Sequence, residues 1–346
     1  MKMKKEDTLA LKGVAIIMML LYHLFYVKQG GDYYSLLSFS GMPLIKRFSE
    51  ICYPVPLYVM LSGYGLYASY ASGKVQKLWK RTLVLYFHLW IIYLIFIPLG
   101  CWLVPDKYPG SVGEFLKNFF SIKCSYNTEQ WFLFPYLLLM FFSKPIFRLI
   151  DSIKPVFSLL LAVFFELLYI GLYKMFGLDC LHEYLGVGIQ LLFVISFLLP
   201  FTLGALARKC CWVEKVAQIA PLDCRNVKRV NLIKFFAIVF LLCVIVIRMF
   251  VPNQSLQILV VFLFMLLFPL LRVDKYSMAV LQFLGKHSLN IWLIHTWLCY
   301  YLFKDLIYGL KYPILIFVAT LLLSLLISII VEIIYKKIST IIDKEK

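Results

Sequence analysis

The sequence has few charged residues, and acidic ones are rarer than basic ones. Only 15% of its 346 residues are charged, and 18 Asp and Glu stand against 35 Lys and Arg. Soluble domains carry charge on about 25% of their residues, so this composition excludes a soluble globular protein. The net charge of +17 comes from basic residues clustered in short loops between apolar runs. Such clusters indicate membrane topology and contacts with lipid headgroups rather than binding of nucleic acid.

The sequence also lacks metal-binding spacings and interdomain linkers. Its nine cysteines form no CxxC pair, and no spacing of Cys and His suits a metal ion. Cys101, Cys124 and Cys180 could face outward, where a disulfide can form, but the sequence does not pair them. No stretch rich in Ser, Gly or Pro divides the chain, and no loop is long enough for a soluble catalytic domain. We therefore expect a single membrane domain over residues 1–346 that carries any chemistry itself.

Apolar residues are abundant: 62% of the chain is hydrophobic, 17% is aromatic and the mean hydropathy is +0.86. An apolar segment of about 20 residues can cross a bilayer as a helix. The pattern predicts an all-α, polytopic membrane protein with about ten transmembrane helices in one bundle. The ten segments lie near residues 9–27, 51–70, 82–104, 129–149, 155–177, 184–207, 231–251, 255–272, 288–308 and 312–335.

The distribution of basic residues predicts the orientation of these segments. With the amino terminus on the cytoplasmic side, the inner connections hold 23 Lys and Arg and the outer connections hold 8. Cytoplasmic loops of membrane proteins carry an excess of Lys and Arg. We therefore expect both termini of this multi-pass protein to be cytoplasmic.

The first segment, residues 9–27, carries two ionisable side chains in an apolar run. Lys12 and His23 are eleven residues apart, which is about 16 Å along a helix axis and about three full turns, so both lie on nearly one face. Ionisable groups inside a spanning helix are costly and usually mark a functional site. Alternatively, Lys12 could extend its ammonium group to the cytoplasmic surface, and His23 could have a structural role.

Four of the five histidines, His23, His88, His287 and His295, lie in apolar segments or at their edges. Histidine is the usual general base near neutral pH and can take a proton from a hydroxyl group. His23 is the best placed, because it lies near the outward end of the first segment. His295 could be a second catalytic group or a core histidine bonded to a neighbouring helix. His182 lies in a short acidic loop and is expected to be an ordinary surface residue.

Three further groups of residues have both a structural and a functional interpretation. Small residues such as Ser62 and Gly63 allow close helix packing, and Ser62 is also a candidate substrate contact. Glu129 and Trp131 open the fourth segment at the outer interface, where Trp is common and where Glu129 could contact a polar acceptor. The basic cluster between the second and third segments is a topology signal or a cradle for phosphate groups. It contains Lys77, Lys80 and Arg81.

Five short motifs occur in order along the chain. They are Lys12-Gly13 followed by His23, Leu61-Ser62-Gly63-Tyr64 with the basic run to Arg81, Gln130-Trp131-Phe132-Leu133 leading to Lys144-Pro145, Leu284-Gly285-Lys286-His287-Ser288, and Ile291-Trp292-Leu293-Ile294-His295. Together the motifs and the helix count resemble membrane acyltransferase family 3, bacterial O-acyltransferases that modify surface glycans. The resemblance runs from the first segment to the ninth.

The resemblance implies a function for the membrane bundle. Family members use a cytosolic acyl-CoA, usually acetyl-CoA, as co-substrate and acylate a hydroxyl group on the outer side of the cytoplasmic membrane. We therefore expect an O-acetyltransferase without a metal, whose partners are acyl-CoA, a carbohydrate acceptor and membrane lipids. The alternative is a transporter or flippase for a lipid-linked sugar, although we see no related halves or paired broken helices of the kind common in transporters.

The resemblance also assigns expected roles to residues. The family pattern in the first helix is an arginine, ten residues and a histidine, which map onto Lys12 and His23. Lys12 keeps the positive charge but lacks the planar fork of arginine, which puts bidentate binding of phosphate in doubt. We expect His23 and His295 to be catalytic. The donor residues are expected to be Lys12, Lys77, Lys80 and Arg81, and the substrate-binding residues Ser62, Glu129 and Trp131.

Overall fold

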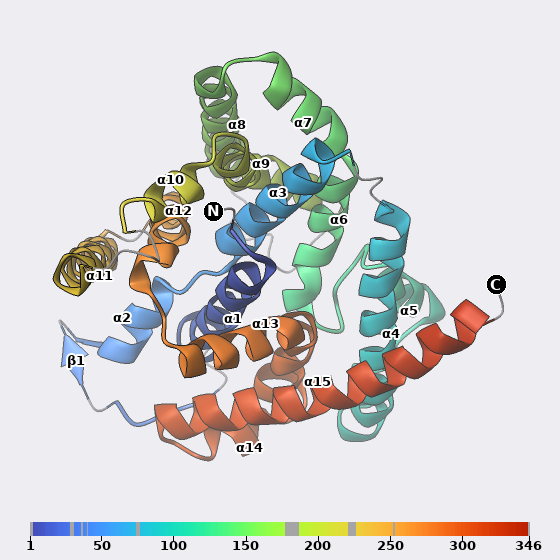
Figure 1. Cartoon of the computed structure of the whole chain (residues 1–346). Coiled ribbons are helices and arrows are strands. Elements are labelled where there is room, and N and C mark those ends of the chain that lie inside the picture. Colours follow the sequence, from blue (N-terminus) through green and yellow to red (C-terminus); the bar gives the residue numbers. More distant parts are fainter. Residues whose placement is uncertain are drawn as a thin grey trace.

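The protein is a bundle of helices of very different lengths (Figure 1). The computed structural model describes residues 3–27, 31–35, 37–39, 41–73, 77–176, 187–220, 226–251 and 253–344. The amino-terminal helices are α1 (Lys5–Tyr22), α2 (Leu44–Glu50), α3 (Val55–Ala71), α4 (Leu78–Leu103) and α5 (Val112–Phe119). The central helices are α6 (Leu133–Phe141), α7 (Ser143–Ser152), α8 (Pro155–Met175), α9 (Val187–Lys209) and α10 (Trp212–Ala217). The carboxy-terminal helices are α11 (Val227–Phe250), α12 (Gln254–Leu271), α13 (Lys275–Thr296), α14 (Lys304–Tyr308) and α15 (Pro313–Lys344).

The remaining elements are short. Strands β1 (Ser38–Phe39) and β2 (Met42–Pro43) form an antiparallel hairpin in which Ser38 is opposite Pro43. Three helical turns of other types are η1 (His23–Val27), η2 (Thr128–Phe132) and η4 (Trp297–Tyr301). The predicted all-α fold is confirmed for the described residues, because the hairpin is the only sheet among them.

Six of the described helices are long and apolar enough to cross a membrane, which confirms a multi-pass membrane protein. They are Lys5–Val27, Leu78–Leu103, Pro155–Met175, Gly188–Lys209, Val227–Phe250 and Pro313–Thr340. A seventh span is formed if Thr128–Phe141 and Ser143–Ser152, which are bent by 51° relative to each other, count as one. Pro145 accounts for this bend, since it cannot donate a backbone hydrogen bond near the start of α7. The expected number of about ten spans is not confirmed.

Three predicted segments differ from spanning helices in specific ways. The second corresponds to α3, which has 17 residues, and the eighth corresponds to α12, an apolar helix shorter than the six spans. The ninth was expected over 288–308, but α13 begins at Lys275 and ends at Thr296. Asp274 starts this helix, because its side chain accepts hydrogen bonds from the backbone amides of Tyr276 and Ser277. Residues 272–286, which were expected to form a basic inner loop, are therefore mostly the first half of α13.

Two pairs of helices pack with their backbones in contact through glycine. A Cβ atom on Gly13 of α1 would lie 2.0 Å from the Leu281 carbonyl oxygen, and one on Gly285 of α13 would lie 1.9 Å from the Leu9 carbonyl oxygen. Gly63 of α3 and Gly204 of α9 make the same kind of approach to the partner helix. Small residues bring membrane helices together in this way. The pair α1 and α13 is consequently held in one register at the centre of the bundle (Figure 1).

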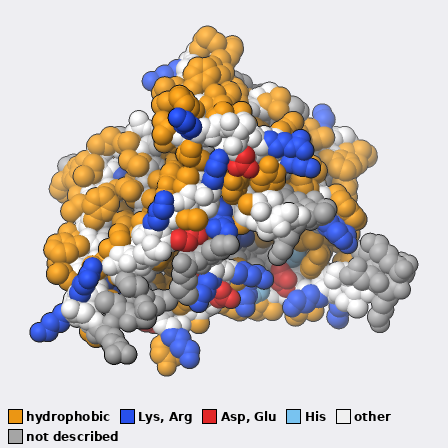
Figure 2. Space-filling view, turned by 45° about the horizontal axis from the view of Figure 1, so that its top comes forward, with side chains coloured by type: hydrophobic (Ala, Val, Ile, Leu, Met, Phe, Trp, Pro, Cys, Tyr) orange, Lys and Arg blue, Asp and Glu red, His pale blue; other side chains and the backbone are white. Residues whose placement is uncertain are grey.

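The surface of the bundle is mostly apolar at its sides and basic on one face. Helices α8 and α11 present rows of exposed Leu, Val and Phe side chains, as expected for helices that face lipid. Figure 2 shows a face on which many Lys and Arg side chains gather between apolar margins. This separation of charge from apolar surface suits a protein embedded in a bilayer.

Candidate active site

The two central helices, α1 and α13, each continue into a π-helical turn. Helix α1 passes at Tyr22 into the π-helical turn η1, whose first residue is His23. Helix α13 passes at Thr296 into the π-helical turn η4, and His295 is one residue before this change. Single π-helical turns within helices are frequent at functional sites. The two histidines therefore lie at matching irregular points of two closely packed helices.

His23 and His295 face each other across this pair. Their ring centroids are 5.0 Å apart, with the ring planes inclined by 59°. His295 is completely buried, whereas the His23 side chain keeps 12% of its surface exposed. Of the two, His23 is therefore the one that a substrate can reach.

The hydrogen bonds of His295 determine which nitrogen carries its proton. Its Nδ1 lies 2.8 Å from the carbonyl oxygen of Trp292 and 3.2 Å from that of Ile291. A carbonyl oxygen only accepts, so Nδ1 must donate and Nε2 is the acceptor in the neutral ring. Nε2 is buried and has no hydrogen-bond partner among the described residues. His295 thus holds an acceptor atom next to His23.

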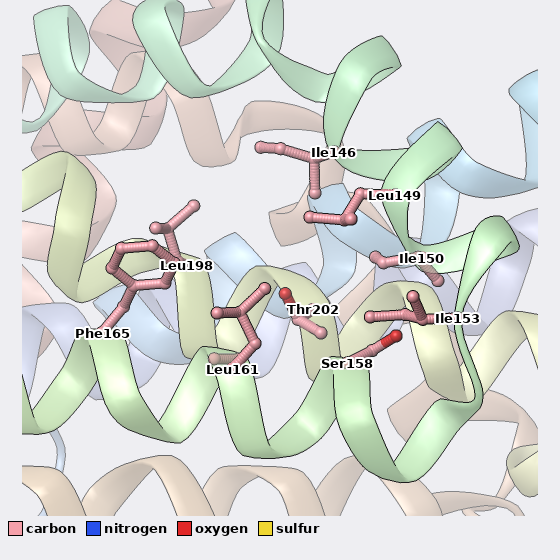
Figure 3. Close-up of a pocket in the computed structure, with 10 residues that line it drawn as sticks. Ile146, Leu149, Ile150, Ile153, Ser158, Leu161, Phe165, Leu198 and Thr202 are labelled. Carbon is pink, nitrogen blue, oxygen red and sulfur yellow. The ribbon is translucent and has the colours of Figure 1, made fainter.

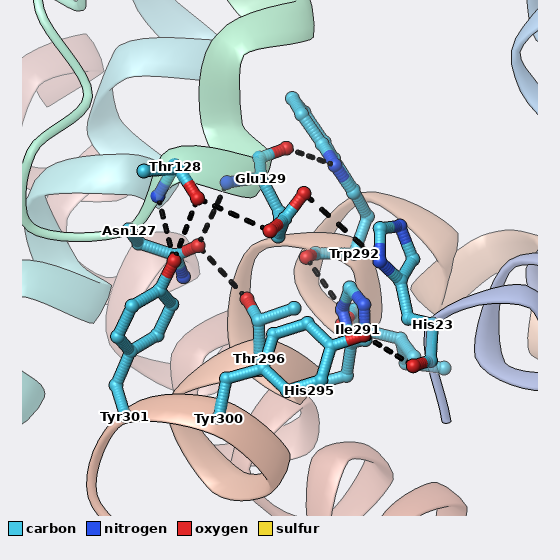
Figure 4. Close-up of polar contacts among 10 residues, drawn as sticks. All are labelled: His23, Asn127, Thr128, Glu129, Ile291, Trp292, His295, Thr296, Tyr300 and Tyr301. Atoms are coloured by element: carbon cyan, nitrogen blue, oxygen red, sulfur yellow. Dashed lines mark hydrogen bonds and ion pairs between the residues drawn. The ribbon is translucent and has the colours of Figure 1, made fainter. Parts of the chain in front are cut away.

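A carboxylate completes the cluster (Figure 4). Oε2 of Glu129, from η2, lies 4.0 Å from Nδ1 of His23, and the Glu129 side chain is only 9% exposed. This distance is longer than a hydrogen bond, but such pairs often shorten when substrate binds. Glu129 is well placed to hold His23 with Nδ1 protonated, which leaves Nε2 of His23 as a proton acceptor.

Hydrogen bonds within η2 and to two other elements hold Glu129 in position. Thr128 donates through Oγ1 to Oε1 of Glu129, over 3.1 Å, and also lies 2.8 Å from the hydroxyl of Tyr301. The indole nitrogen of Trp292 donates to the Glu129 carbonyl oxygen over 3.2 Å. Asn127 accepts a hydrogen bond from Thr296 over 2.9 Å. The carboxylate is therefore positioned by η2, α13 and η4 together.

Several residues of this cluster were not found from the sequence. Tyr300 donates a hydrogen bond to the carbonyl oxygen of His23, and Tyr301 binds Thr128 (Figure 4). Asn127 and Trp292 are further members. No signal in the sequence could have selected these side chains, because aromatic and polar residues at the ends of apolar segments are common in membrane proteins. Only the meeting of η1, η2 and η4 brings them together.

The comparison with protein families decides what kind of protein this is. The family model described as an acyltransferase domain matches residues 10–333, which is nearly the whole chain. The chain belongs to membrane acyltransferase family 3. The expected resemblance is thereby confirmed, and the protein is an integral-membrane acyltransferase. No curated protein and no solved structure shows a significant match to the chain.

The expected donor residues of this acyltransferase lie at the start of α4 and on α1. Lys77 is the residue before α4, and Lys80 and Arg81 lie in its first turn; all three are exposed. Lys12 is half-buried on α1, and Arg81 is close enough for its charge to act on Lys12. The structure therefore brings Lys12 and Arg81 near each other, one to three turns from the cytoplasmic ends predicted for their helices.

Two expected substrate residues lie outside the cluster around His23. Ser62 donates a hydrogen bond to the hydroxyl of Tyr136 over 3.3 Å, which links α3 to α6. The Trp131 ring packs against Phe193 of α9, with centroids 4.4 Å apart. Both contacts are those of residues that join helices, so their assignment as substrate contacts stays a prediction. Glu129 lies in the cluster, but beside His23 rather than alone at an outer mouth.

A cavity of about 230 Å³ lies between α7, α8 and α9 (Figure 3). Its walls are apolar except for the hydroxyl groups of Ser158 and Thr202. None of the residues around His23 lines it. This cavity is therefore separate from the candidate active site of the acyltransferase.

The cysteines among the described residues are all free. Cys101 and Cys124, for which an outward disulfide was an open possibility, are both free, and Cys180 and His182 lie outside the described residues. Burial raises the pKa of the Cys124 thiol to about 12. At neutral pH this thiol stays protonated and is a poor nucleophile. Among the described residues, no group of three or more His, Cys, Asp and Glu side chains is arranged to hold a metal ion.

Proposed function

We propose that the protein transfers an acyl group, most simply acetyl, from cytosolic acyl-CoA to a hydroxyl group of a cell-surface or lipid-linked carbohydrate. The observation that carries this proposal is the buried cluster of His23, His295 and Glu129 in a chain that belongs to an acyltransferase family. Transfer to a hydroxyl needs a group that accepts its proton. A transporter or flippase for a lipid-linked sugar needs no such group, and the pairing of His23 with Glu129 therefore favours the transferase.

The proposed reaction is a direct substitution at the thioester carbonyl. The acceptor hydroxyl oxygen attacks this carbon while Nε2 of His23 takes the hydroxyl proton. The bond between carbon and sulfur then breaks, and the CoA thiolate leaves and takes up a proton, so that ester and free CoA are the products. Glu129 stabilises the positive charge that His23 gains during the attack. The cluster is buried, with His295 fully covered and the Glu129 side chain 9% exposed, and this burial limits access of water and so hydrolysis of the thioester.

The proposal predicts that Lys12 and Arg81 bind the phosphate groups of acyl-CoA. Lys12→Ala and Arg81→Ala should each raise the KM for acyl-CoA about 10- to 100-fold, because a hydrogen bond to a charged group is lost. Lys12→Arg should preserve or lower this KM, since arginine binds phosphate with a planar fork. Steady-state kinetics with acyl-CoA and acceptor varied separately measure both constants.

The matched control for these variants is Lys117→Ala, which removes an exposed lysine of α5. Its donor KM should equal that of the wild type. An unchanged donor KM in both Lys12→Ala and Arg81→Ala would leave these residues as topology signals only.

The proposal also requires a fixed orientation, with both termini and residues 208–220 on the cytoplasmic side. A cysteine placed at Gln218, in a chain without its native cysteines, should resist a membrane-impermeant maleimide in intact cells. It should react once the membrane is permeabilised. Labelling of this cysteine from outside intact cells would reverse the orientation and with it the proposed side of each substrate.

The transfer itself is tested with purified protein in lipid vesicles. Radiolabelled acetyl-CoA is added with cell-envelope glycan, and alkali-labile label on the glycan is measured. Ester-linked label that requires the protein supports an O-acetyltransferase. Movement of lipid-linked sugar across the vesicle membrane without any labelled ester would instead identify a flippase.

A further inference from the structure

A second polar cluster lies beside the candidate active site. Arg248 belongs to α11, which otherwise presents apolar side chains outward, yet only 3% of its surface is exposed. Its Nη1 lies 3.6 Å from Oε1 of Glu50 and donates to the carbonyl oxygen of Val251 over 2.9 Å. A buried charge in a spanning helix is costly, and it is a candidate functional group by default.

Unpaired polar atoms gather around this ion pair. Buried polar atoms are nearly always hydrogen-bonded, so each exception calls for an explanation. Five buried atoms on helices α2, α8, α11 and α12 have no hydrogen-bond partner among the described residues. They are Nε of Arg47, Oγ of Ser49, Oε2 of Glu166, Nε of Arg248 and Oε1 of Gln257.

Hydrogen bonds between helices place these five residues in one region. Arg47 donates to the carbonyl oxygen of Met249, next to Arg248, over 3.4 Å. Gln257 donates to the carbonyl oxygen of Ile51, next to Glu50, over 2.6 Å. Ser255, two residues before Gln257, donates to Oε1 of Glu166 over 2.9 Å. Helix α2 is therefore linked to α11 and, through Ile51, to α12, and α12 is linked in turn to α8.

Tyrosine side chains connect this second polar cluster to His23. The Tyr22 ring is 5.6 Å from the His23 ring, centroid to centroid, and 5.3 Å from the rings of both Tyr26 and Tyr53. The charges of Glu129, Glu50 and Arg248 all act on the Tyr22 phenol. Tyr22 thus stands between the proton-accepting histidine and the second polar cluster.

The chemistry of the cluster indicates what it would bind. Its free atoms include donors on two arginines, acceptors on Glu166 and Gln257, and a serine hydroxyl that can do both. The cluster holds two arginines, Arg47 and Arg248, and two acidic residues, Glu50 and Glu166, so the formal charges sum to zero, and Arg248 and Glu50 form an ion pair. Sugar hydroxyls both donate and accept, and the apolar face of a sugar ring packs on tyrosine. A negatively charged ligand would need an excess of cationic groups.

We infer that the cluster around Glu50, Glu166 and Arg248 is the subsite for the acceptor and that it takes an uncharged sugar ring. This inference rests on the proposed function, since it names the substrate class and its place. The acceptor hydroxyl would reach His23 past Tyr22, on the side of the site opposite to Lys12 and Arg81. Glu166 and Gln257 would select for hydroxyl groups rather than for carboxylates.

The test compares Glu166→Gln with Glu214→Gln in otherwise complete protein in detergent. Glu166 and Glu214 are both buried carboxylates, but Glu214 pairs with Arg208 at the other end of the bundle. Binding of neutral methyl glycosides of glucose, galactose and N-acetylglucosamine is measured by calorimetry, with methyl glucuronide as the anionic counterpart. Transfer of acetyl from acetyl-CoA to the same glycosides is measured in parallel.

At least one neutral glycoside should bind, and Glu166→Gln should raise both its Kd and its KM about tenfold, because one acceptor oxygen of the carboxyl group is replaced by an amide group that only donates. Glu214→Gln should change neither constant, and the KM for acetyl-CoA should stay constant in both variants. A second variant, Gln257→Leu, should weaken binding of the same glycoside. The same loss in both variants shows that it does not come from misfolding of Glu166→Gln.

Transfer with unchanged Kd and KM for the glycoside in both cluster variants, or tighter binding of the glucuronide, overturns this inference while the proposed function stands. Absence of transfer to any glycan, with acetyl-CoA bound, would instead count against the proposed function.

Discussion

Replacing His23 by glutamine is expected to lower the turnover number about 10²- to 10⁴-fold, the usual contribution of a general base. Glutamine has a similar size and can form hydrogen bonds, but it cannot take up the proton of the acceptor hydroxyl. The KM for acyl-CoA should change little, because the expected donor residues lie on other turns and helices. Single-turnover transfer from radiolabelled acetyl-CoA measures the chemical step directly.

The matched control for His23→Gln is His287→Gln. His287 also lies in the helical bundle, on α13, but its Nδ1 is 2.8 Å from the hydroxyl of Ser328, away from the candidate site. This control should keep near-normal turnover, and both variants should elute as monodisperse folded protein. A folded His23→Gln protein with near-normal turnover would exclude His23 as the base and would leave Nε2 of His295 as the proton acceptor.

Replacing Glu129 by glutamine is expected to have the second largest effect, a fall in turnover of about 10²-fold or more. The carboxylate lies 4.0 Å from Nδ1 of His23 and accepts a hydrogen bond from Thr128, while Trp292 holds the backbone carbonyl of Glu129. The carboxylate can therefore orient the imidazole and stabilise its positive charge. Removing the corresponding carboxylate from a serine protease lowers turnover about 10⁴-fold. Because Glu129 acts through His23, the loss should appear in turnover and not in the KM for acyl-CoA.

Two further variants separate positioning from a structural role of Glu129. Glu129→Asp keeps the charge but shortens the side chain, and it should recover part of the activity that Glu129→Gln loses. Thr128→Val removes one hydrogen bond to the carboxylate and should lower turnover by a smaller factor, about 10-fold. Equal turnover of Glu129→Gln and the wild type would show that His23 needs no carboxylate.

The sequence located part of the candidate site because ionisable residues stand out in apolar helices. His23 could be selected in this way, and its packing against His295 agrees with the two histidines acting together. Glu129 was expected near the outer interface, but its place beside His23 could not be foreseen. Ser62 and Trp131 could not be told apart from ordinary packing residues, because their types are common in membrane helices.

The limits of the helices were predicted less well than their presence. Hydropathy does not register the hydrogen bonds that Asp274 makes at the start of α13, nor the effect of Pro145 on the path of the chain between α6 and α7. It also does not distinguish a helix that crosses the bilayer from a shorter apolar helix such as α12. The number of spans therefore could not be derived from apolar segments alone.

The sequence by itself determined the class of the protein, its helical membrane fold and its membership of the acyltransferase family. These properties follow from composition and from residues a few positions apart, which act through the local periodicity of a helix and the cost of placing charge in lipid. Only the tertiary structure decided that Glu129 faces His23, that Nε2 of His295 is the acceptor atom, and that Arg248 and Glu166 lie in one polar cluster. The contact of Glu129 with His23 and the grouping of Arg248 with Glu166 join residues far apart in the chain, and their geometry depends on the combined packing of several helices, including the close approach of Gly13 and Gly285. The acceptor nitrogen of His295 follows from hydrogen bonds to Ile291 and Trp292 within α13, which depend on how the side chain is placed in the structure.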